Sequence, residues 1–157
     1  MKASSVNDIK KELRTLDADK LVGLCMRLAK YKKENKELLS YLLFEAYDDN
    51  AYIGTVKEVV DDYYKELPRG NTYYVKKSLR KILRYLNRQI KYSSIPQTEL
   101  ELRIYFLSKM KEAKVPMPGG TVLYNLYQQQ LKKIKTIFGK LPEDLQTDYE
   151  REMKYLH

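Results

Sequence analysis

The sequence predicts an all-α protein, folded as a compact bundle or short array of seven to eight helices in a single domain, residues 1–157. Apolar residues recur at helical spacing along most of the chain. Only 6 Gly and 5 Pro occur, which is few for an all-β protein that must turn often. A chain of 157 residues can bury roughly 70% of the surface that it exposes when unfolded, which is enough for one hydrophobic core.

The first two predicted helices are short. Residues 8–16 form the first, with Asn7 as its N-cap, and residues 18–32 form the second, with Asp17 as its N-cap. Cys25 falls in the apolar stripe of the second helix, so we expect it to pack there as a small hydrophobic side chain.

The next two predicted helices differ in character. Residues 36–49, with Asn35 as N-cap, are apolar nearly all round, which predicts the central helix of the bundle. Residues 51–67 place apolar side chains at helical spacing and carry four carboxylates on the other side: Glu58, Asp61, Asp62 and Glu66. Residues 68–71, "PRGN", end this helix because proline and glycine interrupt regular structure.

The second half contains a basic helix followed by an ambiguous segment. The basic helix, residues 72–93, ends before Pro96, which disfavours helix in the residue preceding it. Within residues 97–113, the apolar residues of the stretch 99–106 alternate as in a strand, yet others fit a helix. We favour a helix, because a lone strand would have no partner.

Two further helices complete the prediction. Residues 121–138 form one, with Gly139 as its C-cap, and the last helix begins with Pro142 at its first position.

Charge is the most unevenly distributed property of the chain. Of a formal net charge of +9, nearly all resides in residues 67–98, which hold 8 basic and no acidic side chains. A helix over 72–93 gathers its apolar residues on one side and seven cations on the other, over a length of about 23 Å. The candidate contact residues for an anionic partner are Lys76, Lys77, Arg80, Lys81, Arg84, Arg88 and Lys91, with Tyr85 at the margin.

This basic helix has several interpretations. It is a solvated face, or it is neutralised by Asp61, Asp62 and Glu66 of the preceding helix, or it binds nucleic acid, an acidic protein or a membrane surface. Like charges four residues apart destabilise an isolated helix by roughly a few tenths of a kcal/mol per pair, and that cost favours an anionic partner.

The chain contains few residues of the kinds that usually carry out catalysis. Cys25 and His157 are the only cysteine and histidine, and no catalytic, cofactor or metal-binding motif appears. We therefore expect a non-enzymatic binding or scaffold protein without a cofactor, whose contact surface is helix 72–93. A nucleic-acid-binding protein that uses the same surface is the alternative. A single cysteine fits a reducing compartment, and we see neither a secretory leader nor an apolar run of the roughly 20 residues that span a bilayer, so a cytoplasmic location is expected.

Four segments resemble an uncharacterised all-helical bacterial family over about residues 8–110. They are "IKKELRTLDADKLVGLCMRLAK", "NKELLSYLLFEAY", "VKKSLRKILRYLNRQ" and "ELELRIYFLSKM". The family has a Lys/Arg/Gly/Pro-rich segment before its basic helix, of which only "PRG" is present here. The resemblance implies a helical fold and brings no known activity.

Overall fold

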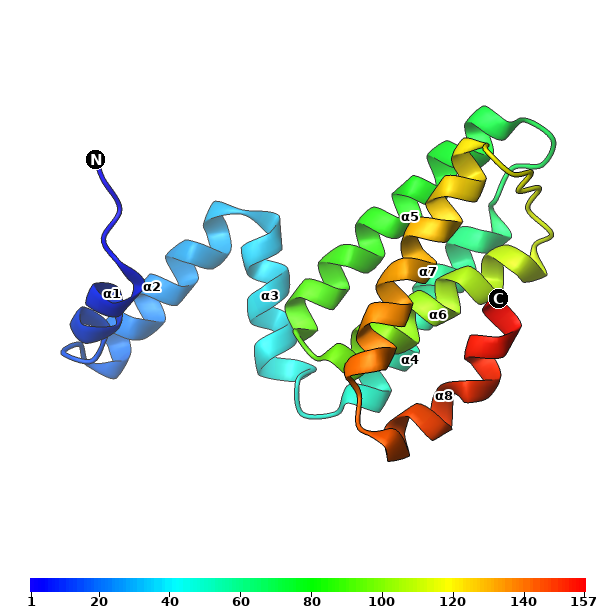
Figure 1. The fold of residues 1–157 in the computed structure, drawn as a ribbon. Coiled ribbons are helices and arrows are strands. Elements are labelled where there is room, and N and C mark those ends of the chain that lie inside the picture. The colour runs from blue at the N-terminus through cyan, green and yellow to red at the C-terminus, as the bar shows by residue number, and fades with distance from the viewer. The chain divides into compact units, whose positions relative to one another are not determined.

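The computed structural model describes residues 1–157 and contains eight helices and no strands (Figure 1), which confirms the all-α prediction. None of these helices is long and apolar enough to cross a membrane. The helices are α1 (Val6–Leu13), α2 (Ala18–Tyr31), α3 (Lys33–Phe44), α4 (Asp49–Lys65), α5 (Thr72–Ser93), α6 (Pro96–Glu112), α7 (Val122–Lys140) and α8 (Glu143–Leu156).

Residue contacts group the chain into two compact units, Met1–Phe44 and Glu45–His157. That the chain forms one domain over residues 1–157 stays a prediction.

The first unit contains α1, α2 and α3. Asp17 is the N-cap of α2, as predicted, because its side chain accepts a hydrogen bond from the Lys20 N–H at 2.9 Å. The N-cap of α1 is Ser5, not Asn7: the Ser5 Oγ accepts the Asp8 N–H at 3.1 Å. Both residue types are good caps, and Ser5 starts the helix two residues earlier.

Helices α2 and α3 pack against each other as a pair. Asn35 does not cap α3, which begins at Lys33; its Nδ2 donates to the Leu28 carbonyl oxygen at 2.8 Å and so joins the two helices. Cys25 is exposed, so the prediction that it is packed is wrong. Only α3 packs extensively against α2, so Cys25 stays exposed although it lines the pocket between the two helices.

The prediction that residues 36–49 form the central helix is wrong. Helix α3 ends at Phe44, and a turn separates it from α4, whose N-cap is Asp48. Tyr41 is the only buried residue of α3, and the exposed fractions of Leu42, Leu43 and Phe44 are 57%, 62% and 67%. An apolar composition allows a helix to be buried, but the neighbouring helices decide whether it is.

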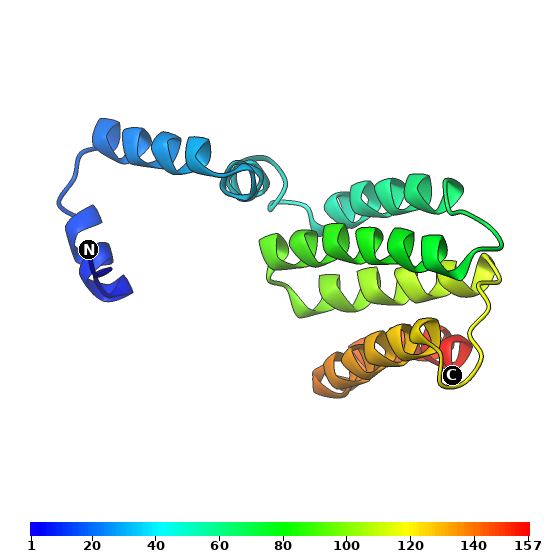
Figure 2. The same cartoon turned by 90° about the horizontal axis from the view of Figure 1, so that it is seen from above.

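The central helix of the second unit is α6. It contacts α4, α5, α7 and α8; in Figure 2, α4 and α5 lie above it and α7 and α8 below it. Residues 99–106 lie within this helix, which confirms the helical interpretation. Because four helices pack against α6, its apolar residues need not follow a single stripe, and this explains the strand-like alternation. The buried residues of α6 are Thr98, Leu100, Leu102, Arg103, Ile104, Phe106, Leu107 and Met110.

The remaining helix ends differ slightly from prediction. Helix α7 continues through Gly139 to Lys140, so Gly139 is not its C-cap. Pro142 is the N-cap of α8 and not its first helical residue. These differences of one or two residues leave the order of the helices unchanged.

Candidate anion-binding face of helix α5

Helix α5 positions all eight residues that the sequence singled out. The Asn71 side chain caps its start by accepting the Tyr73 N–H at 2.9 Å, and Ser94 ends it in the left-handed conformation (φ 57°). The apolar side is buried as predicted and faces α4 and α6. Its buried residues include Val75, Leu79, Ile82, Leu83, Leu86 and Ile90.

The seven cations lie on the opposite side of α5, and we call them the basic face. Five of them are exposed: Lys77, Arg80, Lys81, Arg84 and Lys91. Lys76, Arg88 and the marginal Tyr85 are half-buried. The guanidinium Nε of Arg88 is buried without a hydrogen-bond partner, so this nitrogen is not accessible to a binding partner.

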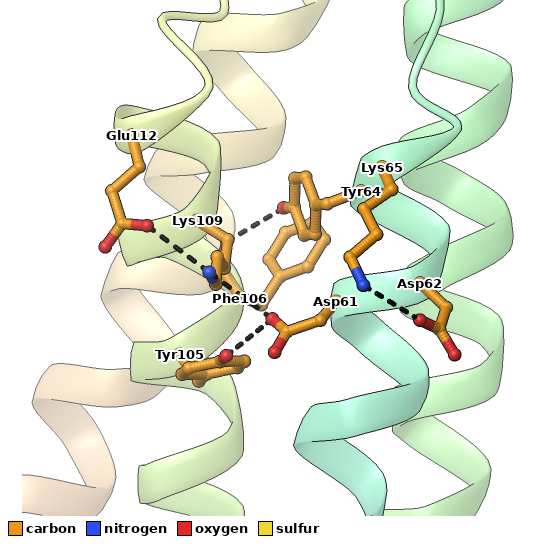
Figure 3. A network of polar contacts seen from close by, with 8 residues as sticks. All are labelled: Asp61, Asp62, Tyr64, Lys65, Tyr105, Phe106, Lys109 and Glu112. Atoms are coloured by element: carbon orange, nitrogen blue, oxygen red, sulfur yellow. Dashed lines mark hydrogen bonds and ion pairs between the residues drawn. The ribbon is translucent and has the colours of Figure 1, made fainter.

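The carboxylates of α4 do not neutralise the basic face. Asp61 accepts a hydrogen bond from the Tyr105 hydroxyl and pairs with Lys109 Nζ at 3.4 Å, both on α6 (Figure 3). Asp62 pairs with Lys65 of its own helix at 3.5 Å, and Glu66 forms no ion pair. None of the seven cations of the basic face forms an ion pair with a carboxylate. The structure therefore contradicts the interpretation that Asp61, Asp62 and Glu66 neutralise the basic face.

Tyrosine rings border the basic face. The Tyr63 ring of α4 lies 5.8 Å from the Tyr85 ring between centroids, and Lys81 Nζ lies 5.2 Å from the Tyr63 centroid. At the start of α5, Tyr73 and Tyr74 are exposed by 59% and 54%. Sequence analysis missed Tyr63, because only the packing of α4 beside α5 brings it to this face.

A second polar cluster, also missed from the sequence, joins α4, α6 and α8. Glu101 of α6 accepts a hydrogen bond from the Tyr149 hydroxyl at 2.8 Å and lies 3.7 Å from Lys57 Nζ. Lys109 Nζ contacts both Asp61 and Glu112 at 3.4 Å (Figure 3). Apart from the Lys109–Glu112 pair within α6, these contacts join different helices, so the cluster links α4 and α8 to α6.

Two tyrosines of this cluster link its stability to pH. Burial, with a contribution from the hydrogen bond to Asp61, raises the pKa of Tyr105 to about 12. Burial is also the main cause that raises the pKa of Tyr149 to about 12. A tyrosine in the unfolded chain titrates near 10, so above about pH 10 the unfolded chain releases protons that the folded chain still holds. The stabilisation by the neutral phenols is complete below about pH 10 and is lost as the pH rises towards about 12.

We therefore expect the free energy of unfolding to fall between about pH 9 and about pH 11, and to fall less in the double variant Tyr105→Phe/Tyr149→Phe. Urea denaturation at the two pH values measures the free energy of unfolding of the wild type and of the double variant. The double variant Tyr73→Phe/Tyr124→Phe, which changes exposed tyrosines, is the matched control. If the free energy of unfolding fell equally in the wild type and in the Tyr105/Tyr149 variant, the raised pKa values of these two tyrosines would not be the cause.

Comparisons with protein-family models, with curated proteins and with solved structures give no match. The resemblance to an uncharacterised bacterial family stays a prediction. The fold and the site define a class of protein. It is an all-helical protein in which one helix presents a row of cations that form no ion pairs and are bordered by tyrosine rings.

Proposed function

We propose that this protein is a non-enzymatic binding protein that contacts the phosphates of nucleic acid through the basic face of α5. The observation that carries the proposal is the absence of any carboxylate partner for its seven cations, five of which are exposed. Like charges crowded on one helix cost stability, and an array of phosphates offsets that cost.

Nucleic acid fits this face better than an acidic protein for two reasons. The cations form one continuous row of a single sign, and a nucleic-acid backbone is likewise a regular row of a single sign. Tyrosine rings border the row, and rings of this kind stack on unpaired bases. A bacterial, cytoplasmic setting is part of the proposal, and the single cysteine is compatible with a reducing compartment.

Binding through this face is expected to depend steeply on salt, because each neutralised phosphate releases counterions. With five exposed cations on duplex phosphates, the affinity should fall roughly 500-fold between about 50 and 200 mM salt. The triple variant Lys77→Gln/Arg80→Gln/Arg84→Gln leaves two of these cations, and its affinity should fall only about 12-fold over the same range. Fluorescence anisotropy with labelled single- and double-stranded DNA and RNA measures both slopes.

A matched control removes three positive charges elsewhere. Lys132, Lys135 and Lys154 are exposed on α7 and α8, so their change to glutamine alters net charge equally without touching α5. The proposal fails if this control weakens binding as much as the α5 variant, or if the wild type does not bind at about 50 mM salt. Competition by poly-glutamate as effective as competition by unlabelled DNA would also overturn it and indicate an acidic protein partner.

A further inference from the structure

A pocket of about 670 Å³ lies at one end of the second unit. It is formed where the turn between α4 and α5 meets the turn that follows α6; the two turns lie at the same end of the helices in Figure 1. None of the residues that line the pocket belongs to the basic face. Its volume falls within the range of roughly 300–1,000 Å³ that small-molecule sites occupy.

The floor of this pocket is apolar. Val75 and Val115 are buried, and Leu67 and Pro68 are half-buried. Tyr64 adds a fixed aromatic side chain, because its hydroxyl donates to the Phe106 carbonyl oxygen at 2.8 Å. A floor of this kind suits the flat, weakly polar face of an organic ligand.

The rim of the pocket carries an excess of positive charge. Lys65, Arg69 and Lys114 line it, against one carboxylate, Glu112. The Glu112 carboxylate pairs with Lys109 Nζ at 3.4 Å, which lowers its repulsion of an anion. Lys65 pairs with Asp62 at 3.5 Å, but both side chains are more than three-quarters exposed, so the pair is weak and leaves Lys65 available.

Lys114 occupies a backbone position that favours glycine. It has a φ of 53°, and the N–H groups of Lys114 and Val115 cap α6 by donating to the Lys111 and Met110 carbonyl oxygens, at 2.9 and 3.3 Å. Left-handed residues that end helices in this way are usually glycine, because a side chain there is strained. A lysine at this position places a cation on the rim at a conformational cost.

We propose that this pocket binds a single nucleotide, with its phosphate at Arg69, Lys114 and Lys65 and its base on the floor formed by Tyr64, Val75 and Val115. The lining of the pocket suits an anion with an apolar or aromatic body, and the choice of a nucleotide rests on the proposed function. Lys76 and Lys77 of the basic face directly follow Val75 along the chain. The nucleotide is either free or the phosphorylated end of a strand that lies along α5.

Two probes separate these sources. Equilibrium dialysis with labelled adenosine 5′-monophosphate measures binding of a free nucleotide. Fluorescence anisotropy with 3′-labelled single-stranded oligodeoxythymidylate, carrying either a 5′-phosphate or a 5′-hydroxyl, measures recognition of a strand end. The wild type should bind the monophosphate or should prefer the 5′-phosphate by about tenfold, since phosphate contacts to Arg and Lys are strong hydrogen bonds.

The test variant is Arg69→Gln/Lys114→Gly. Glycine readily adopts the positive φ of position 114, and the side chain of Arg69 is exposed. The variant should therefore keep its fold, which circular dichroism verifies. It should lose the nucleotide or the 5′-phosphate preference, whereas Lys132→Gln/Lys135→Gln, with the same change in charge, should retain it.

The outcomes distinguish failure of the pocket from failure of the proposed function. Oligonucleotide binding with no phosphate preference, together with no monophosphate binding, overturns the pocket and leaves the basic face in place. Retention of nucleotide binding by the test variant also overturns the pocket. Monophosphate binding that the test variant loses, with no oligonucleotide binding by the wild type, supports the pocket and overturns the proposed function.

Discussion

Replacing Phe106 of α6 by alanine is expected to lower the free energy of unfolding by about 4 kcal/mol. Phe106 has no exposed surface, its ring lies 5.9 Å from the Tyr64 ring between centroids, and its helix contacts four others. Truncating such a side chain removes its transfer free energy and leaves a cavity that the surrounding helices cannot close. Urea denaturation followed by far-UV circular dichroism measures the loss.

Phe44 provides a matched control with the same chemistry. It ends α3, and 67% of its surface is exposed, so Phe44→Ala should change the free energy of unfolding by about 0.5 kcal/mol or less. A larger loss for Phe44→Ala than for Phe106→Ala would restore α3 as the central helix and refute the placement of α6.

Replacing Gln130 of α7 by leucine is expected to cost about 2–3 kcal/mol. Gln130 is buried, and its Oε1 accepts a hydrogen bond at 2.7 Å from Nη1 of Arg103, which is only 5% exposed. Arg103 Nε donates to Glu99 Oε1 of the same helix at 2.9 Å. Leucine removes the acceptor and leaves part of a buried guanidinium without a partner, which costs more than the hydrogen bond itself contributes.

The double variant Arg103→Met/Gln130→Leu should recover at least about 1 kcal/mol relative to Gln130→Leu, because both partners are then apolar. Glu99 retains partial exposure and can be hydrated after its partner is removed. Gln128→Leu changes an exposed glutamine of the same helix and serves as the control. Equal or greater instability of the double variant would show that the arginine acts through its packing and not through its charge.

The sequence predicted that the positive charge lies on one side of α5, but it could not predict whether carboxylates of α4 pair with these cations. Helical spacing within α5 separates apolar residues from cations, and this property belongs to one helix. Whether Asp61 reaches the basic face depends on how α4 is rotated against α5 and α6. In the structure, Asp61 points to Tyr105 and Lys109 of α6. The arrangement of Tyr63 beside Tyr85, and the pocket formed by two separate turns, depend in the same way on contacts between distant segments.

The sequence by itself determined the all-α class, the boundaries of α5 and its two-sided character, because helical periodicity and capping are local properties. Only the tertiary structure decided which helix is central. The segment that includes α3 is apolar on nearly every side, yet α3 buries only Tyr41 in the structure, whereas α6, whose apolar pattern is irregular, is enclosed by four helices. Burial depends on how many neighbours surround a helix, and that number is set by contacts between segments far apart in the chain.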